Sequence, residues 1–457
     1  MDFLMVVLDG AVRESMLFAA TWFLIGGVDD LGVDLCFFVD RLRHWQAPRR
    51  WVSDLPERAV PALFAIFVPA WREEAVIGAM LAATTSRFGD SGYRVYVGVY
   101  PNDPATIEAA QGFAERDPRI RVIVGPRDGP TTKADCLNIL WAALERDDAA
   151  AERPTEAIVI HDAEDVVHPA ELRVFDALLQ SYAVVQVPVL PLIRSGSLVS
   201  GHYADEFAYA HGMQQPVRAM LGAPLPLAGT GCAIRTDVLG EIAVERGGAP
   251  FDASCLTEDY ELGLHVAGRG GGVCFARIWD PHDRSLVAVR AYFPETFQTA
   301  IRQKARWMTG IALAGWDRIG WGLPGAFADH WMRMRDRRAL ISVVVLGVAY
   351  GAILLWVAVA TAHWLSGVPD TGQHIAGWLC WTTTLLLGWR VAVRIVCTTS
   401  AYGWREGCWS VPRVLVANLI ALLATPLALR RYALFLRGDS PVWDKTVHAF
   451  PDIDTLG

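Results

Sequence analysis

Apolar residues are concentrated at the two ends of the chain, whereas the middle alternates between apolar runs and polar segments. Residues 3–27 are mostly apolar, although Asp9, Arg13 and Glu14 interrupt them. A helix that crosses a bilayer needs about 20 apolar residues, so we expect one span here with polar groups near its outer end. A cleaved signal peptide is less favoured because no basic residue precedes the apolar run.

The segment 29–51 mixes Leu, Phe and Val with Asp and Arg, a composition that suits a helix lying in the membrane interface. Basic residues are retained on the cytoplasmic side of a membrane. We therefore expect the chain after this segment to be cytoplasmic, because four arginines stand close together: Arg41, Arg43, Arg49 and Arg50.

The C-terminal third repeats the apolar signal. Residues 340–365 carry no Asp, Glu, Lys or Arg and predict a second span, which a basic segment at 333–338 precedes. Residues 376–398 predict a return span. The stretch 414–429 is also apolar, but Arg430 and Arg431 would then lie outside, so we expect an interfacial or re-entrant helix.

Between the ends, short apolar runs alternate with segments of helical periodicity. The pattern predicts four strands and three helices before residue 166, the strands at 61–71, 93–103, 119–126 and 156–165. Such alternation is typical of an α/β fold with a mostly parallel sheet, in which ligands bind beyond the carboxyl ends of strands. The polar segments "YPND", "GPRDGPTTK" and "HDAED" all follow predicted strands, so we expect them to share one cleft.

These patterns divide the chain into four parts. Residues 1–58 form an N-terminal membrane and interfacial region, and 59–310 an α/β domain large enough to bury its own core. Residues 311–339 are expected to form interfacial helices, and 340–457 a C-terminal membrane region.

Composition supports a membrane protein. The 457 residues are 53% hydrophobic with a mean hydropathy of +0.27, and 18 are Trp, which is favoured at membrane interfaces. A net charge of −8 gives no reason to expect nucleic acid as a partner. The eight cysteines include no C-x-x-C pair, so neither a zinc site nor a disulfide framework is indicated.

The segment "HDAED" ends a buried strand with three crowded carboxylates, those of Asp162, Glu164 and Asp165. A hard divalent cation such as Mg²⁺ or Mn²⁺ would offset their repulsion, and a solvated acidic turn is the alternative. Lys133, at a helix start, could meet a phosphate, neutralise the carboxylates, or simply be solvated. Asp103 in "YPNDP" either forms a turn or binds a base or ribose.

Two later segments carry further candidates. Glu258 and Asp259 open a predicted helix, where acidic residues are ordinary capping groups but where one facing a cleft could act as a general base. Gln303, Arg306 and Trp307 lie on one side of another helix. Trp can stack on a sugar and Arg can pair with a diphosphate, but both residues also anchor helices at membrane surfaces.

The order of these motifs decides between the readings. D-x-[DE], then T-E-D, then Q-x-x-R-W, followed by membrane spans, resembles the family 2 glycosyltransferases of the polysaccharide-synthase type. The resemblance implies a GT-A domain, a Rossmann-like nucleotide-diphospho-sugar transferase, inserted between N- and C-terminal transmembrane helices. It also implies a Mg²⁺ or Mn²⁺ cofactor and a bacterial inner-membrane location with the catalytic domain in the cytoplasm.

Carried over by motif, the resemblance gives each candidate a role. Asp103 and Asp162 would bind the nucleotide, with Lys133 near the phosphates. Glu164 would hold the metal. The family usually has Asp at that position, so Asp165 may share or replace it as ligand. Asp259, next to Glu258, would be the general base. The acceptor and diphosphate site would be shaped by Gln303, Arg306 and Trp307, with the Gly-rich turn 228–235 near the acceptor.

The implied reaction is an inverting transfer from a nucleotide sugar, with a UDP-sugar expected, to a growing exported polysaccharide. The alternatives are transfer to a lipid or single acceptor, and a catalytically silent membrane scaffold. Export may need a partner or a homo-oligomer, because three or four spans are few for a channel. The sugar and its linkage are not fixed by any motif.

Several segments, including "PAWREEAVIG", "RQKARW" and "WDKTVHAFP", are also similar to the bacterial phage-adsorption protein B type of glycosyltransferase. Longer members of that group carry a domain that binds cyclic di-GMP, which we expect to be absent here because the chain stops at Gly457. Arg390 and Arg394 have the R-x-x-x-R spacing of another cyclic-di-GMP module, but their apolar surroundings argue against that role.

Overall fold

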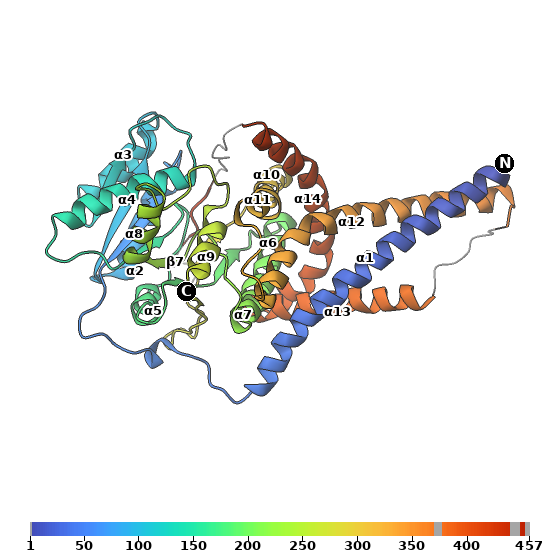
Figure 1. Cartoon of the computed structure of the whole chain (residues 1–457), viewed down its shortest axis with the longest axis horizontal. Coiled ribbons are helices and arrows are strands. Elements are labelled where there is room, and N and C mark those ends of the chain that lie inside the picture. Colours follow the sequence, from blue (N-terminus) through green and yellow to red (C-terminus); the bar gives the residue numbers. More distant parts are fainter. Residues whose placement is uncertain (1, 370–376, 439–447, 453–457) are drawn as a thin grey trace.

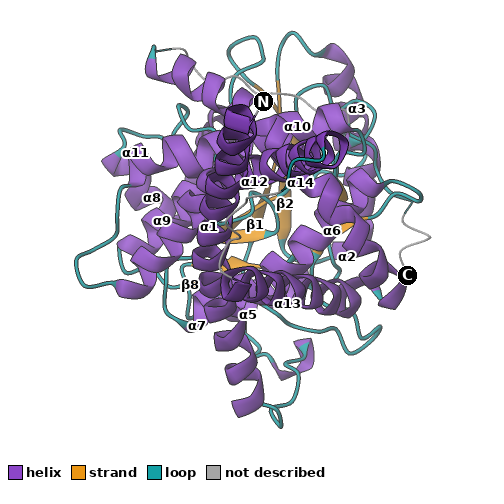
Figure 2. Cartoon of the chain, turned by 90° about the vertical axis from the view of Figure 1, so that its right-hand side faces the viewer, coloured by secondary structure: helices purple, strands orange, loops and turns teal. Residues whose placement is uncertain are grey.

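The computed structural model describes residues 2–369, 377–438 and 448–452. A mixed α/β domain lies at one end of the molecule, and long helices extend away from it (Figure 1). In the view from the side of the long helices, the strands of the domain lie behind them (Figure 2). Of the segment "WDKTVHAFP", the part from His448 onward lies within the described ranges, and the first five residues lie outside them.

The predicted alternation of strands and helices is confirmed in the first half of the domain. The elements, in chain order, are β1 (Phe64–Pro69), α2 (Ile77–Phe88), β2 (Tyr93–Val99), α3 (Pro104–Ala114), β3 (Ile120–Val124), α4 (Lys133–Ala149) and β4 (Ala157–Ile160). Local sequence explains several boundaries. Pro104 begins α3, where a missing N–H costs nothing, and the Thr132 hydroxyl caps α4 by accepting a bond from the Asp135 N–H at 3.2 Å.

The main sheet has seven strands in the order β3-β2-β1-β4-β7-β5-β8. Strands β1 to β4 are parallel, and β1 and β4 are buried along their whole length. The edge beyond β4 is mixed, because β7 (Cys232–Arg235) runs antiparallel to both β4 and β5 (Val184–Gln186). A second, two-stranded sheet pairs β6 (Val189–Leu192) with β9 (Val289–Tyr292).

The second half of the domain contributes the remaining elements: α5 (Glu171–Leu178), α6 (Leu198–Tyr209), α7 (Gln215–Met220), α8 (Thr236–Glu245), α9 (Glu258–Gly268), β8 (Val273–Phe275), α10 (Phe297–Trp307) and α11 (Gly315–Ile319). Two π-helical segments continue longer helices, η2 (Ala210–Gln214) after α6 and η3 (Met308–Ala314) after α10. A short 3₁₀ turn, η1, covers Val52–Asp54. π-Helical turns often occur at functional sites.

Three described helices are long and apolar enough to cross a membrane, by length and composition: α12 (Phe327–Ser366), α13 (Gly377–Tyr402) and α14 (Trp404–Leu436). In Figure 1, α12 and the N-terminal helix α1 (Asp2–Arg43) run side by side, and α14 runs across their direction where they meet the α/β domain. The span predicted at 340–365 thus falls within α12, and the described part of the span predicted at 376–398, from Gly377 onward, falls within α13.

The N-terminal region differs from the expected span and separate interfacial helix, because residues 3–27 and the predicted interfacial segment as far as Arg43 belong to the single helix α1. Its acidic residues pair with the basic start of α12. Asp30 accepts a bond from Arg335 at 2.9 Å, and Arg338 contacts both Asp29 and Asp30. Asp29 and Asp30 are therefore neutralised by arginines of α12. A separate helix in the membrane interface is not needed to expose these carboxylates to water.

Candidate functional site

Most of the candidate residues line one cavity of about 560 Å³ beside the carboxyl ends of β1 and β4. Its lining includes Lys133, Asp162, Glu164, Asp165, Glu258, Asp259, Gln303, Arg306 and Trp307. Of the three segments expected to share a cleft, "GPRDGPTTK" and "HDAED" supply lining residues, whereas "YPND" does not. The other candidates reach the cavity from helices α9 and α10. Glu73 and His448, for which no role was predicted, line the same cavity.

Lys133 lies at the centre of this group. Its Nζ donates to Asp162 Oδ1 at 2.5 Å and to the Gly229 carbonyl at 2.8 Å. Burial acts to raise the pKa of Asp162, but the Lys133 ammonium, assisted by His448 and Arg306, holds that pKa below its usual range. Asp162 is therefore an ionised carboxylate at neutral pH. Of the readings left open for Lys133, the structure shows the one in which it neutralises the carboxylates.

Glu258 and Asp259 occupy the first turn of α9 and face the same cavity. Burial raises the pKa of Asp259, which Lys133 and Arg306 oppose, and burial next to Asp259 raises the pKa of Glu258 to about 7. Asp259 Oδ1 accepts a bond from the Tyr260 N–H at 2.8 Å, which fixes the orientation of the carboxylate. A half-buried carboxylate with a raised pKa is the kind of group that accepts a proton in general base catalysis.

The loop that contains Gly229 closes over Asp259. Gly229 has a φ of +75°, and a Cβ at this position would stand 2.7 Å from Asp259 Oδ2. Both the backbone conformation and the close approach therefore require glycine. This places the Gly-rich turn, which the sequence associated with the acceptor, directly against the candidate base.

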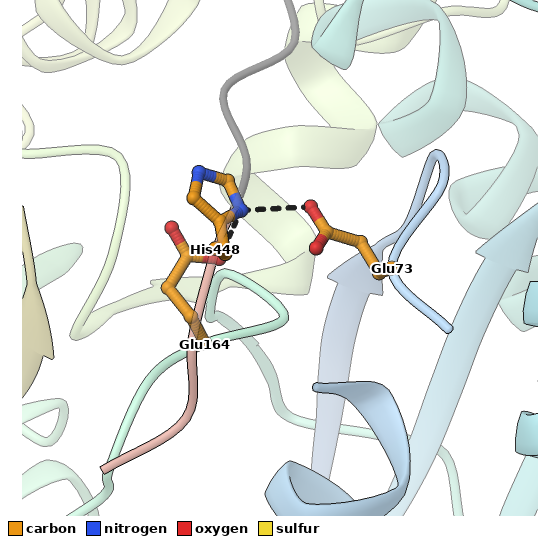
Figure 3. Close-up of side chains that lie close together, drawn as sticks. All are labelled: Glu73, Glu164 and His448. Carbon is orange, nitrogen blue, oxygen red and sulfur yellow. Dashed lines mark hydrogen bonds and ion pairs between the residues drawn. The ribbon is translucent and has the colours of Figure 1, made fainter. Parts of the chain in front are cut away.

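Glu164 lies in a cluster with Glu73 and His448 (Figure 3). His448 Nδ1 is 2.9 Å from Glu73 Oε1 and 3.2 Å from Glu164 Oε2, and one donor atom from each residue lies within 4.8 Å of the others. Burial and the neighbouring carboxylates raise the pKa of Glu164 to about 8, although His448 opposes the shift. Two carboxylates and one imidazole are a donor set that fits Mn²⁺ or Mg²⁺, and a divalent cation would relieve the repulsion between them.

Asp165 points elsewhere. It is 1% exposed, and its Oδ2 accepts bonds from the Asp162 N–H at 2.8 Å, from His161 Nδ1 at 3.2 Å and from the Thr230 hydroxyl. His161 in turn contacts Glu171 at 2.8 Å, and the two carboxylates outweigh burial and raise the pKa of His161 to about 10. The Asp165 side chain therefore stabilises the D-A-E turn through hydrogen bonds within the protein. Glu164 is the carboxylate that faces His448.

Asp103 does not line the cavity. It is 5% exposed, and its Oδ2 accepts a bond from the Arg72 N–H at 2.6 Å. Arg72 has a φ of +55°, a conformation that side chains other than glycine rarely adopt, so this bond holds the loop after β1 in a strained form. The structure thus gives Asp103 a part in shaping the loop that carries Glu73.

The Q-x-x-R-W side chains come from α10. Gln303 Oε1 is buried without a hydrogen-bond partner among the described residues, and Trp307 packs edge-on against Tyr203 at 6.0 Å. The helix continues into η3, where a Cβ on Gly310 would stand 2.6 Å from Thr257 Oγ1. Because Thr257 begins the T-E-D motif, this glycine allows the helical segment that follows Q-x-x-R-W to approach the T-E-D motif closely.

A second group of possible ligands lies outside the cavity: His168, Asp280 and Asp283. His168 Nδ1 accepts a bond from the Ala170 N–H at 3.1 Å, and burial lowers the pKa of this imidazole. The neutral ring therefore carries its proton on Nε2, which donates to Ser285 Oγ at 2.9 Å. Neither ring nitrogen has a lone pair left for a metal ion.

The fold and the site define a membrane-associated glycosyltransferase with a GT-A-type domain. Residues 61–310 match the family model described as "Glycosyltransferase like family 2", and the chain belongs to that family. It is 33% identical to "Bacteriophage adsorption protein B" of Escherichia coli strain K12, and equally to "Bacteriophage N4 adsorption protein B" of Escherichia coli O157:H7. Each alignment covers 94% of this chain but only 61% of the relative, so the chain spans about three fifths of their length.

A solved structure shares the fold. A mannosyltransferase from Pyrobaculum calidifontis, in complex with GDP-Man and Mn²⁺, has a TM-score of 0.54 at 16% identity, covering 93% of this chain and all of that chain. At this identity the likeness concerns the fold alone. Together with the family match it confirms the α/β GT-A architecture expected from the sequence.

Proposed function

We propose that this protein transfers a sugar, with inversion, from a nucleotide-sugar donor to an acceptor hydroxyl at the membrane surface. The observation that supports this most directly is the position of Asp259, a half-buried carboxylate with a raised pKa that shares one cavity with the Lys133–Asp162 pair. A proton acceptor and a polar phosphate-binding region thus lie side by side. That is what a displacement at a sugar carbon requires.

In the proposed donor site, Asp162 binds the nucleotide. Lys133 and Arg306 contact the diphosphate. Arg306 lines the cavity, and no ion pair is found for it in the described ranges. Asp103 supports the nucleotide through the loop after β1. We propose Glu164, Glu73 and His448 as the residues that would hold Mg²⁺ or Mn²⁺. A bound ion would supply positive charge to stabilise the departing diphosphate.

In the transfer step, the acceptor hydroxyl gives its proton to an Asp259 oxygen while its own oxygen forms a bond to the anomeric carbon. The bond from that carbon to the diphosphate oxygen breaks, and the electron pair leaves with the nucleoside diphosphate. A single displacement inverts the anomeric centre. Glu258, whose pKa is raised to about 7, is held beside Asp259 and can share the proton.

We propose a UDP-sugar as donor and a growing exported polysaccharide as acceptor, with the domain on the cytoplasmic face of a bacterial inner membrane. Transfer to a lipid or to a single acceptor is the alternative. Lipids surround the long apolar helices, and export would use a partner protein or a homo-oligomer. Both curated relatives are named for bacteriophage adsorption, which suits a product or protein reached from the cell surface.

The test uses the purified protein in detergent with a panel of UDP-sugars and GDP-mannose, with Mn²⁺, Mg²⁺ or a chelator, and measures nucleoside diphosphate release. We expect release with at least one donor, its loss with the chelator, and a decrease of at least about a hundredfold for Asp259→Asn. Asp237→Asn is the matched control, because Asp237 also stands in the first turn of a helix but is exposed. Release that Asp259→Asn leaves unchanged would refute the assignment.

A further inference from the structure

One wall of the cavity consists of aromatic side chains that take no part in the proposed binding of the donor or in the proton transfer to Asp259. Phe207, Phe275, Phe293 and Trp307 all line it. Phe207 lies 4.9 Å from Phe293 and 6.3 Å from Trp307, measured between ring centroids. The rings come from α6, β8, the segment after β9 and α10, so the fold brings them together from distant parts of the sequence.

His211 stands within this aromatic wall, on the π-helical segment η2. Its ring centroid is 5.0 Å from that of Phe207 and 5.4 Å from that of Phe275. The Nδ1 atom accepts a bond from the Val189 N–H at 2.9 Å. Since a backbone N–H always donates, Nδ1 is unprotonated in the neutral ring and the proton resides on Nε2.

The ring stays neutral. Burial, together with the nearby Arg277, lowers the pKa of His211 to about 3. Its Nε2–H is therefore a permanent, uncharged donor over the physiological pH range. No partner for Nε2 is found among the described residues, although His211 lines the cavity.

Two charged residues that line the cavity beside this wall are paired. Arg194 lies 3.9 Å above the ring of Tyr292 and contacts Glu295 at 3.0 Å, and Asp336 is held by Arg218 at 2.9 Å. Phe207, Phe275 and Phe293 thus offer apolar ring faces, and His211 adds one neutral donor, which suits the apolar face and the hydroxyl groups of a sugar ring.

We propose that His211 is a specificity-determining residue of the acceptor site, which donates a hydrogen bond from Nε2 to an oxygen of a neutral sugar ring. Phe207, Phe275 and Phe293 pack against the apolar face of that ring, and Trp307 separates it from the diphosphate region. The inference rests on the proposed function and deepens it: the acceptor is the end of an uncharged glycan and not a lipid phosphate.

The test measures acceptor and donor separately. Neutral gluco-, manno- and N-acetylglucosamine oligosaccharides, and vesicles containing a polyprenyl phosphate, are each added to the wild type with the active donor. We expect the oligosaccharides and not the vesicles to stimulate nucleotide release. For His211→Phe, which removes the N–H and keeps a ring, we expect an acceptor KM raised about three- to tenfold with the donor KM unchanged.

Two further variants separate recognition from folding. His211→Gln keeps a donor near the position of Nε2 and should restore part of the acceptor affinity. His202→Phe makes the same replacement at a fully buried histidine of α6 that does not line the cavity, and should leave both KM values unchanged. An acceptor KM that His211→Phe leaves unchanged, or stimulation by the polyprenyl phosphate alone, would overturn the inference.

Calorimetric titration of the oligosaccharides into the wild type with UDP and Mn²⁺ provides a readout that needs no turnover. Binding that weakens in His211→Phe supports the inference even if no donor in the panel is used. Absence of binding by every oligosaccharide overturns it, whereas the proposed function fails separately if no donor releases its nucleotide.

Discussion

At the scale of single residues, Lys133 links the parts of the site. Its ammonium bonds to Asp162 and to the Gly229 carbonyl, and it lowers the pKa of Asp259 against the effect of burial. The sequence showed the residue types and their order but left the role of Lys133 open. The deciding fact is a distance between residues far apart in the chain, which no local pattern contains.

Replacing Lys133 with Met should lower kcat/KM for the donor about ten- to hundredfold, because the Asp162 carboxylate loses a charge-assisted bond while it remains largely buried. Steady-state nucleotide release measures the effect. Arg127→Met is the matched control from the same loop, since Arg127 is exposed. A Lys133→Met enzyme with wild-type kcat/KM would contradict this role.

The pH dependence follows from the same groups. A general base works only when ionised, so activity should be present above the pKa of Asp259 and be lost as the pH falls through it. Because burial raises that pKa, the acid limb of the kcat/KM profile should lie above the range of an ordinary aspartate. Lys133 opposes the shift, so Lys133→Met should move the limb to still higher pH. A limb that stays in place would show that another group is being titrated.

The residues that the sequence did not assign lie at two distant places, Glu73 after β1 and His448 after the last helix. Both occur within segments similar to the phage-adsorption group, and that similarity was the available signal. What could not be predicted is that Glu164 would face His448 while its neighbour Asp165 turns toward His161. Glu164 and Asp165 point in different directions because the backbone of the turn sets the orientation of each side chain. The residue types alone do not determine that orientation.

At the scale of secondary structure elements, periodicity and turn residues predicted the first four strands and the helices between them. The antiparallel strand β7 and the π-helical segments η2 and η3 were not anticipated. Parallel and antiparallel buried strands both appear in the sequence as apolar runs, so their direction cannot be predicted from the pattern. A π-helical turn adds one residue to a helix, which does not change the hydrophobic periodicity enough to be recognised. These unpredicted segments carry His211 and the close contact with the T-E-D motif.

That contact makes Gly310 testable. A methyl group at this position would overlap Thr257, so Gly310→Ala should push the start of α9 away from the cavity at a cost of about 1–3 kcal/mol. We expect a lower kcat with little change in donor KM, because Asp259 moves while the Lys133–Asp162 pair stays. Gly112→Ala is the control, as a Cβ on that helical glycine meets nothing within 4 Å. Equal kcat values for the two variants would refute the coupling.

At the scale of the whole molecule, ion pairs join the long helices to the α/β domain. Asp205 on α6 is fully buried and contacts Arg394 at 3.0 Å and Arg413 at 3.4 Å. Arg390 contacts Asp30 at 3.6 Å. The two arginines of the R-x-x-x-R spacing are therefore engaged with acidic partners of the chain.

The cluster in Figure 3 has a consequence for how the chain threads the bilayer. Tyr402, at the end of α13, bonds to the Pro191 carbonyl, Tyr432 near the end of α14 bonds to Asp317, and His448 reaches Glu73. Every one of these partners belongs to the α/β side, so these contacts bring both ends of α14 close to the α/β domain, although α14 is also long and apolar enough to cross a membrane. Under the prediction of an interfacial or re-entrant helix at 414–429, both ends of α14 lie on one side of the membrane.

A membrane-impermeant maleimide should therefore react with cysteines introduced at Arg405 and Arg437, near the two ends of α14, in membranes of the same orientation. Labelling of one site only would mean that α14 crosses. α1 packs along α12, and Asp9 contacts His363 at 2.9 Å near one end of this pair while Asp30 contacts Arg335 at 2.9 Å near the other.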